Sequence, residues 1–277
     1  MNNGFTPLSQ FKPRPRLILG IEGLPDTGKT EFSLTAPPGI GVLAVDRGYE
    51  HVITKAVPPT HRQKDISLKI FPVPQPGENP GDGSKAVYGS YKEMANIYKN
   101  IWDEYAKWYK TAIACPDFRT VVIDGDSDTW DLQQLASFGK VVQVPPLQRT
   151  DVNAARRIMI ARAFDSGKNI IYTYRIKPEY ENKVRINARG VATEVGERTG
   201  EYKRVGFGEQ DYVVQVQLRS LYESSRAGQE ENKYGVRIMK CKPSPELVGF
   251  ELWGGDNNFK GLVEAIYPDA DPKEWGL

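Results

Sequence analysis

Residues 23–30 read Gly-Leu-Pro-Asp-Thr-Gly-Lys-Thr and match in full the phosphate-binding pattern G-x-x-x-x-G-K-[ST]. The apolar run from Arg16 to Glu22 is typical of a β-strand, and Glu31 to Ala36 favours the start of a helix. Strand, glycine loop and helix are the context in which this pattern binds nucleotide phosphates through backbone N–H groups. The predicted nucleotide-binding residues are Gly23, Leu24, Pro25, Asp26, Thr27, Gly28, Lys29 and Thr30.

The end of this loop and the end of a later strand have the chemistry needed to hold Mg²⁺ and ATP. Lys29 would reach the β- and γ-phosphates, and the Thr30 hydroxyl would hold Mg²⁺. Residues 120–124, Thr-Val-Val-Ile-Asp, are typical of a strand buried in a parallel sheet and end in a carboxylate. Asp124 would bind the ion through water opposite Thr30, although a strand-terminal aspartate can also cap a helix. ATP and Mg²⁺ are the predicted cofactors, Lys29 and Asp124 the catalytic residues, and Thr30 and Asp124 the metal ligands.

The composition narrows the class of protein. The chain has 277 residues, of which 39% are hydrophobic and 26% charged, as in an ordinary globular protein. No run approaches the roughly 18–20 apolar residues of a membrane span, and the N-terminus does not have the pattern of a signal peptide. Two cysteines far apart and two histidines predict neither a disulfide framework nor a His/Cys metal site. We expect a cytoplasmic protein without a membrane partner, and a net charge of +2 leaves any DNA contact to a local patch.

Strand-like and helix-like segments alternate along the chain. Such alternation predicts an α/β fold with a mostly parallel central sheet flanked by helices, in which ligands bind at the carboxyl ends of the strands. Two late segments alternate apolar and polar residues and predict a C-terminal antiparallel hairpin at the edge of the sheet. The predicted strands span 16–22, 41–46, 120–124, 168–174, 212–218 and 234–239, and the predicted helices span 31–36, 91–112 and 151–166.

The domain organisation follows from composition along the chain. We predict a flexible N-terminal arm over 1–15, one core domain over 16–255, and a tail over 256–277 with a short helix near 260–265. Residues 181–208 are polar and rich in glycine, and they predict a mobile loop or hairpin within the core.

Two helix starts are predicted from acidic residues. Asp126 and Asp128 follow the strand that ends at Asp124, where they would cap the next helix or contribute to metal binding, with the cap favoured. Asp151 is the predicted N-cap of the helix over 151–166. The inner face of that helix is predicted to consist of Ala154, Ile158, Ala161 and Phe164.

Further polar residues fall at strand ends, where the nucleotide is expected. Asp46 and Glu50 are the candidates for orienting the attacking water, and each could equally be a solvated loop acid. Thr173 could sense the γ-phosphate, and Arg175 or Lys177 could neutralise charge in the transition state. A solvated rim is the alternative for these two cations.

Two lysines, Lys240 and Lys242, leave the last predicted strand on one face, by the two-residue period of a strand. Like charges side by side favour a bound anion, and the phosphate of a nucleotide or of DNA would supply one.

Taken together, these features resemble the RecA-like ATPases. More narrowly, the chain resembles the phage-encoded AAA/RecA-like nucleotide-binding proteins that accompany recombination genes. The stretches that carry this resemblance are Gly23–Thr30, Leu34–Pro38 into Val42–Asp46, Val121–Asp124, Asn169–Thr173, Val236–Lys242 and Phe250–Gly254. The resemblance implies that Lys240 and Lys242 act in trans on the γ-phosphate of a neighbouring subunit, so the chain would assemble into a ring or filament.

The sequence departs from the family at two positions. RecA-type proteins carry a glutamate two residues after the strand-ending aspartate, and here that position is Gly48. Asp46 and Glu50 therefore stand as the replacements for the water-activating residue. The phage family often has a histidine near the end of the fourth strand, and here Tyr174 occupies that place.

The resemblance implies a Mg²⁺-dependent ATPase that acts on single-stranded DNA in phage recombination, annealing or repair, with a single-strand-binding protein as a further partner. DNA contacts are expected in the loop after Asp124 and in 181–208, where acidic residues leave a plain solvated hairpin as the alternative. A P-loop small-molecule kinase and a non-hydrolysing nucleotide-binding module are the alternative functions. The predicted DNA contacts are Lys183, Arg185, Arg189, Lys203 and Arg204.

Overall fold

The structure is a computed structural model that describes residues 15–45, 49, 52, 65–71, 91–141, 144–186, 192–224 and 233–277. Three predicted site residues, Asp46, Glu50 and Arg189, lie outside the described residues. The predicted N-terminal arm also lies outside them, apart from Pro15. In the part of the chain that the structure describes, no helix is both long and apolar enough to cross a lipid bilayer.

The centre of the protein is a sheet with the strand order β3-β2-β4-β5-β1-β7-β8-β9, and β6 pairs with β5 beside this path. Neighbouring strands are parallel from β3 to β7, whereas β8 and β9 run antiparallel. The predicted fold class, a mostly parallel α/β sheet with a C-terminal antiparallel hairpin, is therefore confirmed. The strands are β1 (Ile18–Gly23), β2 (Ile40–Ala44), β3 (Ile66–Ile70), β4 (Thr120–Asp124), β5 (Asn169–Ile186), β6 (Ala192–Arg204), β7 (Val216–Glu223), β8 (Lys233–Cys241) and β9 (Glu251–Trp253).

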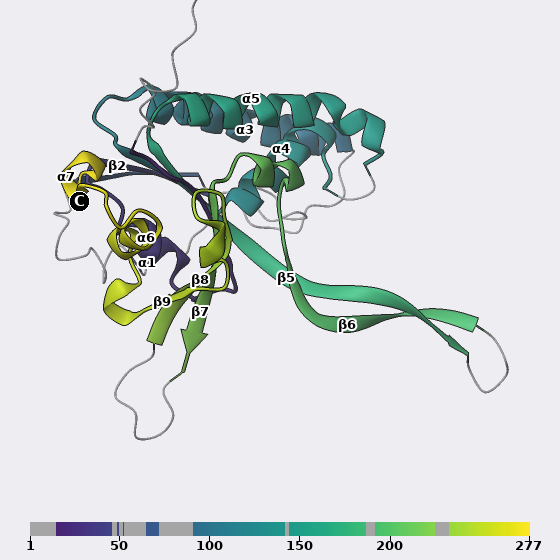
Figure 1. Cartoon of the computed structure of the whole chain (residues 1–277). Helices are drawn as coiled ribbons and strands as arrows, with labels where there is room; N and C mark the ends of the chain where they lie inside the picture. The colour runs from purple at the N-terminus through teal and green to yellow at the C-terminus, as the bar shows by residue number, and fades with distance from the viewer. Residues whose placement is uncertain are drawn as a thin grey trace, which may run out of the picture.

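Helices cover both faces of this sheet. In Figure 1, α3, α4 and α5 lie together over one face, and α1 and α6 lie on the other. The bounds of the helices are α1 (Lys29–Ser33), α3 (Tyr91–Ala114), α4 (Asp126–Phe138), α5 (Thr150–Asp165), α6 (Phe259–Ile266) and α7 (Pro272–Trp275). The helix predicted near 260–265 corresponds to α6, whose side chain cap is Asn258.

The two-residue period of each strand sorts its side chains between two hydrophobic cores. On β4, Val122 packs in the core that contains residues of α1 and α6, whereas Val121 and Ile123 pack in the core that contains residues of α3 and α4. On β5, Ile171 packs in the same core as Val122. Two residues further on, Asp124 therefore faces the α1 side of the sheet, as does Thr173.

The β5 strand continues far beyond the sheet. It pairs with β1 as far as Arg175 and then with β6 from Ile176 onward. Figure 1 shows β5 and β6 projecting from the body as a long two-stranded arm. The hairpin alternative predicted for 181–208 thus matches the described residues, but the strand predicted to end at Tyr174 extends to Ile186. We call the paired residues 176–186 and 192–204 the arm.

The prediction for α5 was wrong in its start and in its buried face. Arg149 precedes the helix, and Asp151 lies within its first turn. Ile158 is 55% exposed, and Phe164 is also exposed. The buried face consists of Val152, Arg156, Ile160 and Ala163. The predicted and observed faces differ because Arg156 is buried, whereas a search for apolar periodicity treats an arginine as a surface residue.

Candidate functional site

The predicted phosphate-binding loop connects β1 to α1. Two of its residues, Asp26 and Gly28, have positive φ angles of 58° and 82°. Left-handed residues in such a loop turn successive backbone N–H groups into a concave anion-binding nest. Gly23 is required for close packing, because a Cβ there would lie 1.8 Å from Ser220 Oγ on β7. Thr27 Oγ1 also lies 2.5 Å from Ser220 Oγ, so β7 contacts the loop at both Gly23 and Thr27.

The structure brings three predicted site residues from α1, β4 and β5 into direct contact. Thr30 Oγ1 lies 3.1 Å from each carboxylate oxygen of Asp124. Thr173 Oγ1 donates to Asp124 Oδ1 at 2.8 Å and accepts from the Gly125 N–H at 2.8 Å. Asp124 is only 2% exposed, so these hydrogen bonds fix its orientation. The contact follows from strand parity, because Asp124 and Thr173 end neighbouring strands on the face that α1 covers.

The donor set at this point fits Mg²⁺. The ion prefers oxygen ligands and keeps several waters, with one or two carboxylates and substrate phosphates completing its shell. Thr30 supplies a hydroxyl and Asp124 a carboxylate. Their oxygen atoms lie 3.1 Å apart, so both can belong to the ligand shell of one ion. Among the described residues there is no group of three or more His, Cys, Asp or Glu side chains that could hold a metal. A single carboxylate with a hydroxyl is the ligand set expected where phosphates bind the same ion.

Lys29 is folded onto its own loop. Its Nζ donates to the carbonyl of Leu24 at 2.5 Å, and the Thr27 hydroxyl donates to the same oxygen at 2.8 Å. The lysine ammonium therefore lies against the same loop that is expected to bind phosphates. Phosphate oxygens would offer the ammonium a stronger, charge-assisted partner than a carbonyl does.

An aromatic pair flanks the loop and was missed by the sequence analysis. Tyr222 on β7 and Tyr234 on β8 are cross-strand partners, with ring centroids 5.3 Å apart. A Cβ added at Gly28 would lie 3.2 Å from the Tyr234 ring, so this ring packs directly against the loop. The two-residue period from Leu218 through Ser220 to Tyr222 was the signal that could have placed this pair.

The helix-cap prediction for Asp126 and Asp128 was wrong. Gly125, with φ of 85°, precedes α4 and no side chain caps it. Asp126 is fully buried and pairs with Arg156 of α5, and Asp128 pairs with Arg175 at 2.8 Å. Both carboxylates are therefore used to fasten α4 to neighbouring elements.

Tyrosines surround the Asp126–Arg156 pair on the α3–α5 side of the sheet. Burial raises the pKa of the Tyr172 and Tyr174 hydroxyls well above their ordinary value, and it raises the pKa of Tyr109 to about 12. These hydroxyls stay protonated and neutral. Tyr174, which replaces the histidine of the resembled family, faces this buried cluster and lies on the opposite face of β5 from Thr173.

The base of the arm is tied to the first turn of α4, because Gly125 alone separates Asp124 from this helix and the loop predicted after Asp124 is absent. Ser127 Oγ accepts from the Arg175 N–H at 3.0 Å and donates to the Val205 carbonyl at 2.6 Å, so one hydroxyl contacts the residue just before the arm and the residue just after it. A second tie comes from β7, where Arg219 Nη2 donates to the Tyr202 carbonyl at 3.2 Å. Arg219 also pairs with Glu22 of β1 at 2.6 Å. The arm is thus connected to the candidate nucleotide site through short chains of hydrogen bonds.

Arg175, predicted to neutralise charge in the transition state, forms ion pairs with two aspartates. Its guanidinium lies 2.8 Å from Asp128 and 3.2 Å from Asp131. The structure therefore places it at the base of the arm, on the side of α4. Its role toward a nucleotide stays a prediction.

The paired lysines at the end of β8 contact backbone oxygens. Lys240 donates to the carbonyls of Asp211 and, at 3.2 Å, Val214, and Lys242 donates to the carbonyl of Tyr212. Burial, together with the neighbouring Lys242, lowers the pKa of Lys240. The two ammonium groups contact neighbouring carbonyls, which agrees with the prediction from strand parity that both lysines leave β8 on one face. None of these acceptors is a carboxylate.

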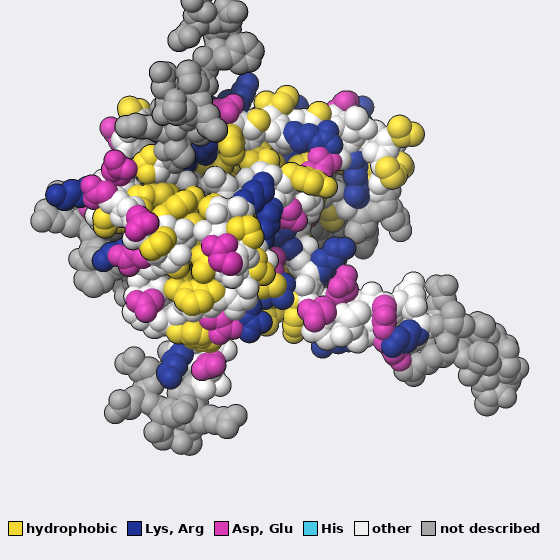
Figure 2. Space-filling view, in the orientation of Figure 1, with side chains coloured by type: hydrophobic (Ala, Val, Ile, Leu, Met, Phe, Trp, Pro, Cys, Tyr) yellow, Lys and Arg dark blue, Asp and Glu magenta, His cyan; other side chains and the backbone are white. Residues whose placement is uncertain are grey.

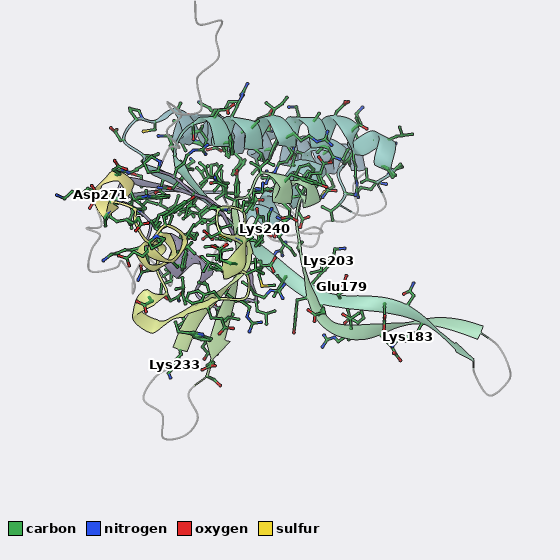
Figure 3. All side chains as sticks on the ribbon, viewed as in Figure 1. Glu179, Lys183, Lys203, Lys233, Lys240 and Asp271 are labelled. Carbon is green, nitrogen blue, oxygen red and sulfur yellow. The ribbon has the colours of Figure 1, made fainter. Side chains whose placement is uncertain are left out.

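The predicted DNA contacts lie along the arm, with one exception outside the described residues. Figure 3 places Lys203 of β6 near the base of the arm and Lys183 of β5 farther out. Lys183 pairs with Glu181 at 2.8 Å and with Glu197 at 3.0 Å, and these hydrogen bonds raise its pKa. Arg185 lies opposite Thr193 in the strand register.

Comparisons with known proteins find similar solved structures but no matching family model and no matching curated protein. Among solved structures, the flagellar accessory protein FlaH from Methanocaldococcus jannaschii is 10% identical, with 87% of this chain and 85% of that chain covered and a TM-score of 0.41. The KaiC-like protein PH0186 from Pyrococcus horikoshii OT3 is 11% identical, with 83% and 81% covered and a TM-score of 0.37. Similarities this distant carry no argument about function. The candidate site is therefore described from this chain's own sheet and phosphate-binding loop.

Proposed function

We propose that this chain is a Mg²⁺-dependent ATPase of RecA-like type that acts on single-stranded DNA in phage recombination, annealing or repair. One observation carries the proposal: Thr30, Asp124 and Thr173 meet beside the P-loop at the sheet edge from which the arm projects. Ligands of open α/β sheets bind at that edge. The same strand therefore connects a nucleotide site to a projecting surface.

The residues around the loop would divide the work of phosphoryl transfer. Lys29 and the loop N–H groups would bind the phosphates, and Thr30 with Asp124 would hold Mg²⁺. When bound, the ion would neutralise charge that develops on the transferred phosphoryl group. Thr173 keeps the Asp124 carboxylate in place through a buried hydrogen bond. Asp46 and Glu50 stay the predicted candidates for orienting the attacking water.

Single-stranded DNA is the partner that best fits the arm. The arm presents cationic and aromatic side chains to solvent, and such surfaces bind the backbone and stack on bases without sequence preference. In Figure 2, Lys and Arg side chains gather on the face of the body next to the base of the arm. Acidic partners such as those of Lys183 would be exchanged for phosphates on binding. That exchange makes affinity fall as salt rises.

Self-association would complete the site through Lys240 and Lys242. Each ammonium group is held by carbonyl oxygens, and burial, followed by the nearby charge of Lys242, lowers the pKa of Lys240. The γ-phosphate of a neighbouring subunit would offset the repulsion between these two charges. Changing both lysines to alanine should stop hydrolysis while leaving the folded monomer intact by circular dichroism. Normal turnover by the double variant would remove the trans-lysine role.

The test of the proposed function is phosphate release from ATP with Mg²⁺, with and without single-stranded DNA, at low and moderate salt. Stimulation by DNA that fades with salt is the expected result. Turnover that ignores DNA but responds to a small-molecule acceptor would favour a kinase instead. Tight ATP binding without phosphate release would favour a non-hydrolysing module.

A further inference from the structure

A pocket opens at the base of the arm, away from the P-loop. Its walls come from α4, from the short helix η3 (Pro146–Arg149), and from the residues of β5 and β6 at the base of the arm. Its volume of about 720 Å³ lies within the range of sites that bind small organic molecules. We call it the arm-base pocket, and the lining residues that matter below are Trp130, Gln134, Arg149, Lys177, Tyr180 and Lys203.

The lining of the arm-base pocket has an excess of positive charge. Four cationic side chains line it against two acidic ones, which leaves a formal charge of +2. Lys177 and Lys203 are direct cross-strand partners, and like charges directly opposite each other on a two-stranded ribbon are destabilising. An anion between them would remove that repulsion. The charged lining residues are Arg149, Lys177, Lys203, Arg204, Asp131 and Glu179.

Two arginines of the pocket lining carry N–H groups that no described residue accepts. Arg204 has a side chain that is only 9% exposed, and it pairs with Asp211 at 3.0 Å, yet its Nη1 has no acceptor. The buried Nε of Arg149 has no acceptor either, and Gln134 Oε1 is a buried oxygen without a donor. Unpaired buried polar groups destabilise a fold, so the pocket wall has hydrogen-bonding capacity that the described residues leave unused.

Aromatic rings line the same pocket. Trp130 of α4 packs against Phe207, with ring centroids 5.0 Å apart, and contributes to the pocket wall. Tyr180 is 55% exposed, and Arg198 both donates to its hydroxyl at 3.1 Å and lies 5.8 Å from its ring centroid. A ligand with both an anionic group and a flat ring would use both kinds of wall. A nucleotide has this chemistry.

We propose that the arm-base pocket binds one nucleotide unit of single-stranded DNA, with the phosphate against Arg149, Lys177 and Lys203 and the base against Tyr180. This inference rests on the proposed action on single-stranded DNA and names the place where the strand is held. It moves the principal contact from the outer arm to its base. Ser127, in the first turn of α4, joins that base to the segment that follows Asp124, so a strand held there lies next to the element that positions the predicted metal ligand.

The test measures the affinity of the full chain for fluorescein-labelled oligo-dT by anisotropy, with Mg²⁺ and a saturating non-hydrolysable ATP analogue to occupy the P-loop. Arg149→Gln changes a pocket residue that lies outside the arm, and Arg162→Gln on the exposed side of α5 removes the same charge elsewhere. Tyr180→Ala removes the ring, and Tyr180→Phe keeps it. All variants change residues that are not fully buried, and circular dichroism checks their folding.

The pocket variants should weaken binding selectively. Arg149→Gln should lower affinity about tenfold and reduce the salt slope by about 0.7, the value for one phosphate contact on a single strand. Tyr180→Ala should lower affinity roughly 5- to 100-fold, and Tyr180→Phe should restore it, because stacking needs the ring alone. Arg162→Gln should bind as the unaltered chain does.

Three results would overturn the proposal, each in a distinguishable way. If the unaltered chain binds oligo-dT and both pocket variants bind equally well, DNA binding stands and the pocket is not its site. If free dTMP displaces labelled oligo-dT at the same concentration as unlabelled oligo-dT does, the pocket binds free nucleotides instead of a strand. If the unaltered chain does not bind oligo-dT at all, the proposed action on DNA fails together with this inference.

Discussion

The candidate nucleotide site and the arm share the strand β5, but their side chains are held in opposite ways. At the site, Thr173 is buried and bonded to both the Asp124 carboxylate and the Gly125 N–H. Along the arm, Lys183 is half exposed and its partners are surface glutamates. Exposed ion pairs contribute about 0–1 kcal/mol, whereas buried hydrogen bonds fix a single geometry. The difference separates a region that must keep its shape from one that can exchange its partners.

The buried Asp126–Arg156 pair should show the largest effect on stability. Arg156→Met leaves a buried carboxylate without its cation and should lower the free energy of unfolding by roughly 3–5 kcal/mol. Lys183→Gln in the arm should change it by no more than about 1 kcal/mol. Urea unfolding followed by circular dichroism measures both. Equal effects would show that the arm is as tightly integrated as the core.

Lys29→Ala should remove turnover without disturbing the arm. Loss of one preorganised cation at a developing charge lowers the rate by roughly 10²–10³-fold. Binding of a fluorescent ATP analogue should fall as well, while oligo-dT binding without nucleotide should persist. Lys99→Ala, which breaks an exposed pair with Asp103 on α3, is the matched control. Retained turnover in Lys29→Ala would place the chemistry elsewhere.

Shortening the arm should remove the response to DNA and spare the nucleotide site. Pro178 and Tyr202 are strand partners, so residues 179–201 can be replaced by a two-residue Asn-Gly turn. The shortened chain keeps the Arg219 bond to the Tyr202 carbonyl. ATP analogue binding should be unchanged within about twofold, and DNA stimulation of phosphate release should vanish. Persistent stimulation would assign DNA contact to the body.

Ser127→Ala should give the smallest effect and would test the connection between the two regions. The hydroxyl bridges the Arg175 N–H and the Val205 carbonyl, and its loss leaves two groups unpaired at a cost of roughly 1–3 kcal/mol. The ratio of DNA-stimulated to basal turnover should fall roughly fivefold. Ser137→Ala, which loses a bond to the Gln133 carbonyl within the same helix, should leave the ratio unaltered. If both variants behave alike, the bridge carries no coupling.

The features that sequence predicts well here depend on short-range patterns. The P-loop is a contiguous motif, and the buried run 120–124 identifies its strand because a strand covered on both faces is apolar throughout. The meeting of Thr30 with Asp124 then follows from strand parity and the parallel sheet. Neither step needs knowledge of distant side chains.

The features that sequence missed depend on partners far along the chain. Arg156 is buried only because Asp126 lies opposite it, a relation across 30 positions that no periodicity reveals. The extension of β5 past Tyr174 needs β6 as its partner, and the polar composition of both strands hides them from a search for apolar alternation. The tyrosine pair beside Gly28 needs the β7–β8 register.

The length of β5 has a mechanical consequence. The eleven residues from Ile176 to Ile186 extend the strand by about 35 Å at about 3.3 Å per residue. A rod of that length, rotated by about 10° at its anchored end, would carry its far end through roughly 6 Å. The arm would therefore act as a lever whose short side ends at Thr173, so a shift of about 2 Å around a bound phosphate would become a displacement of roughly 6 Å at the far end.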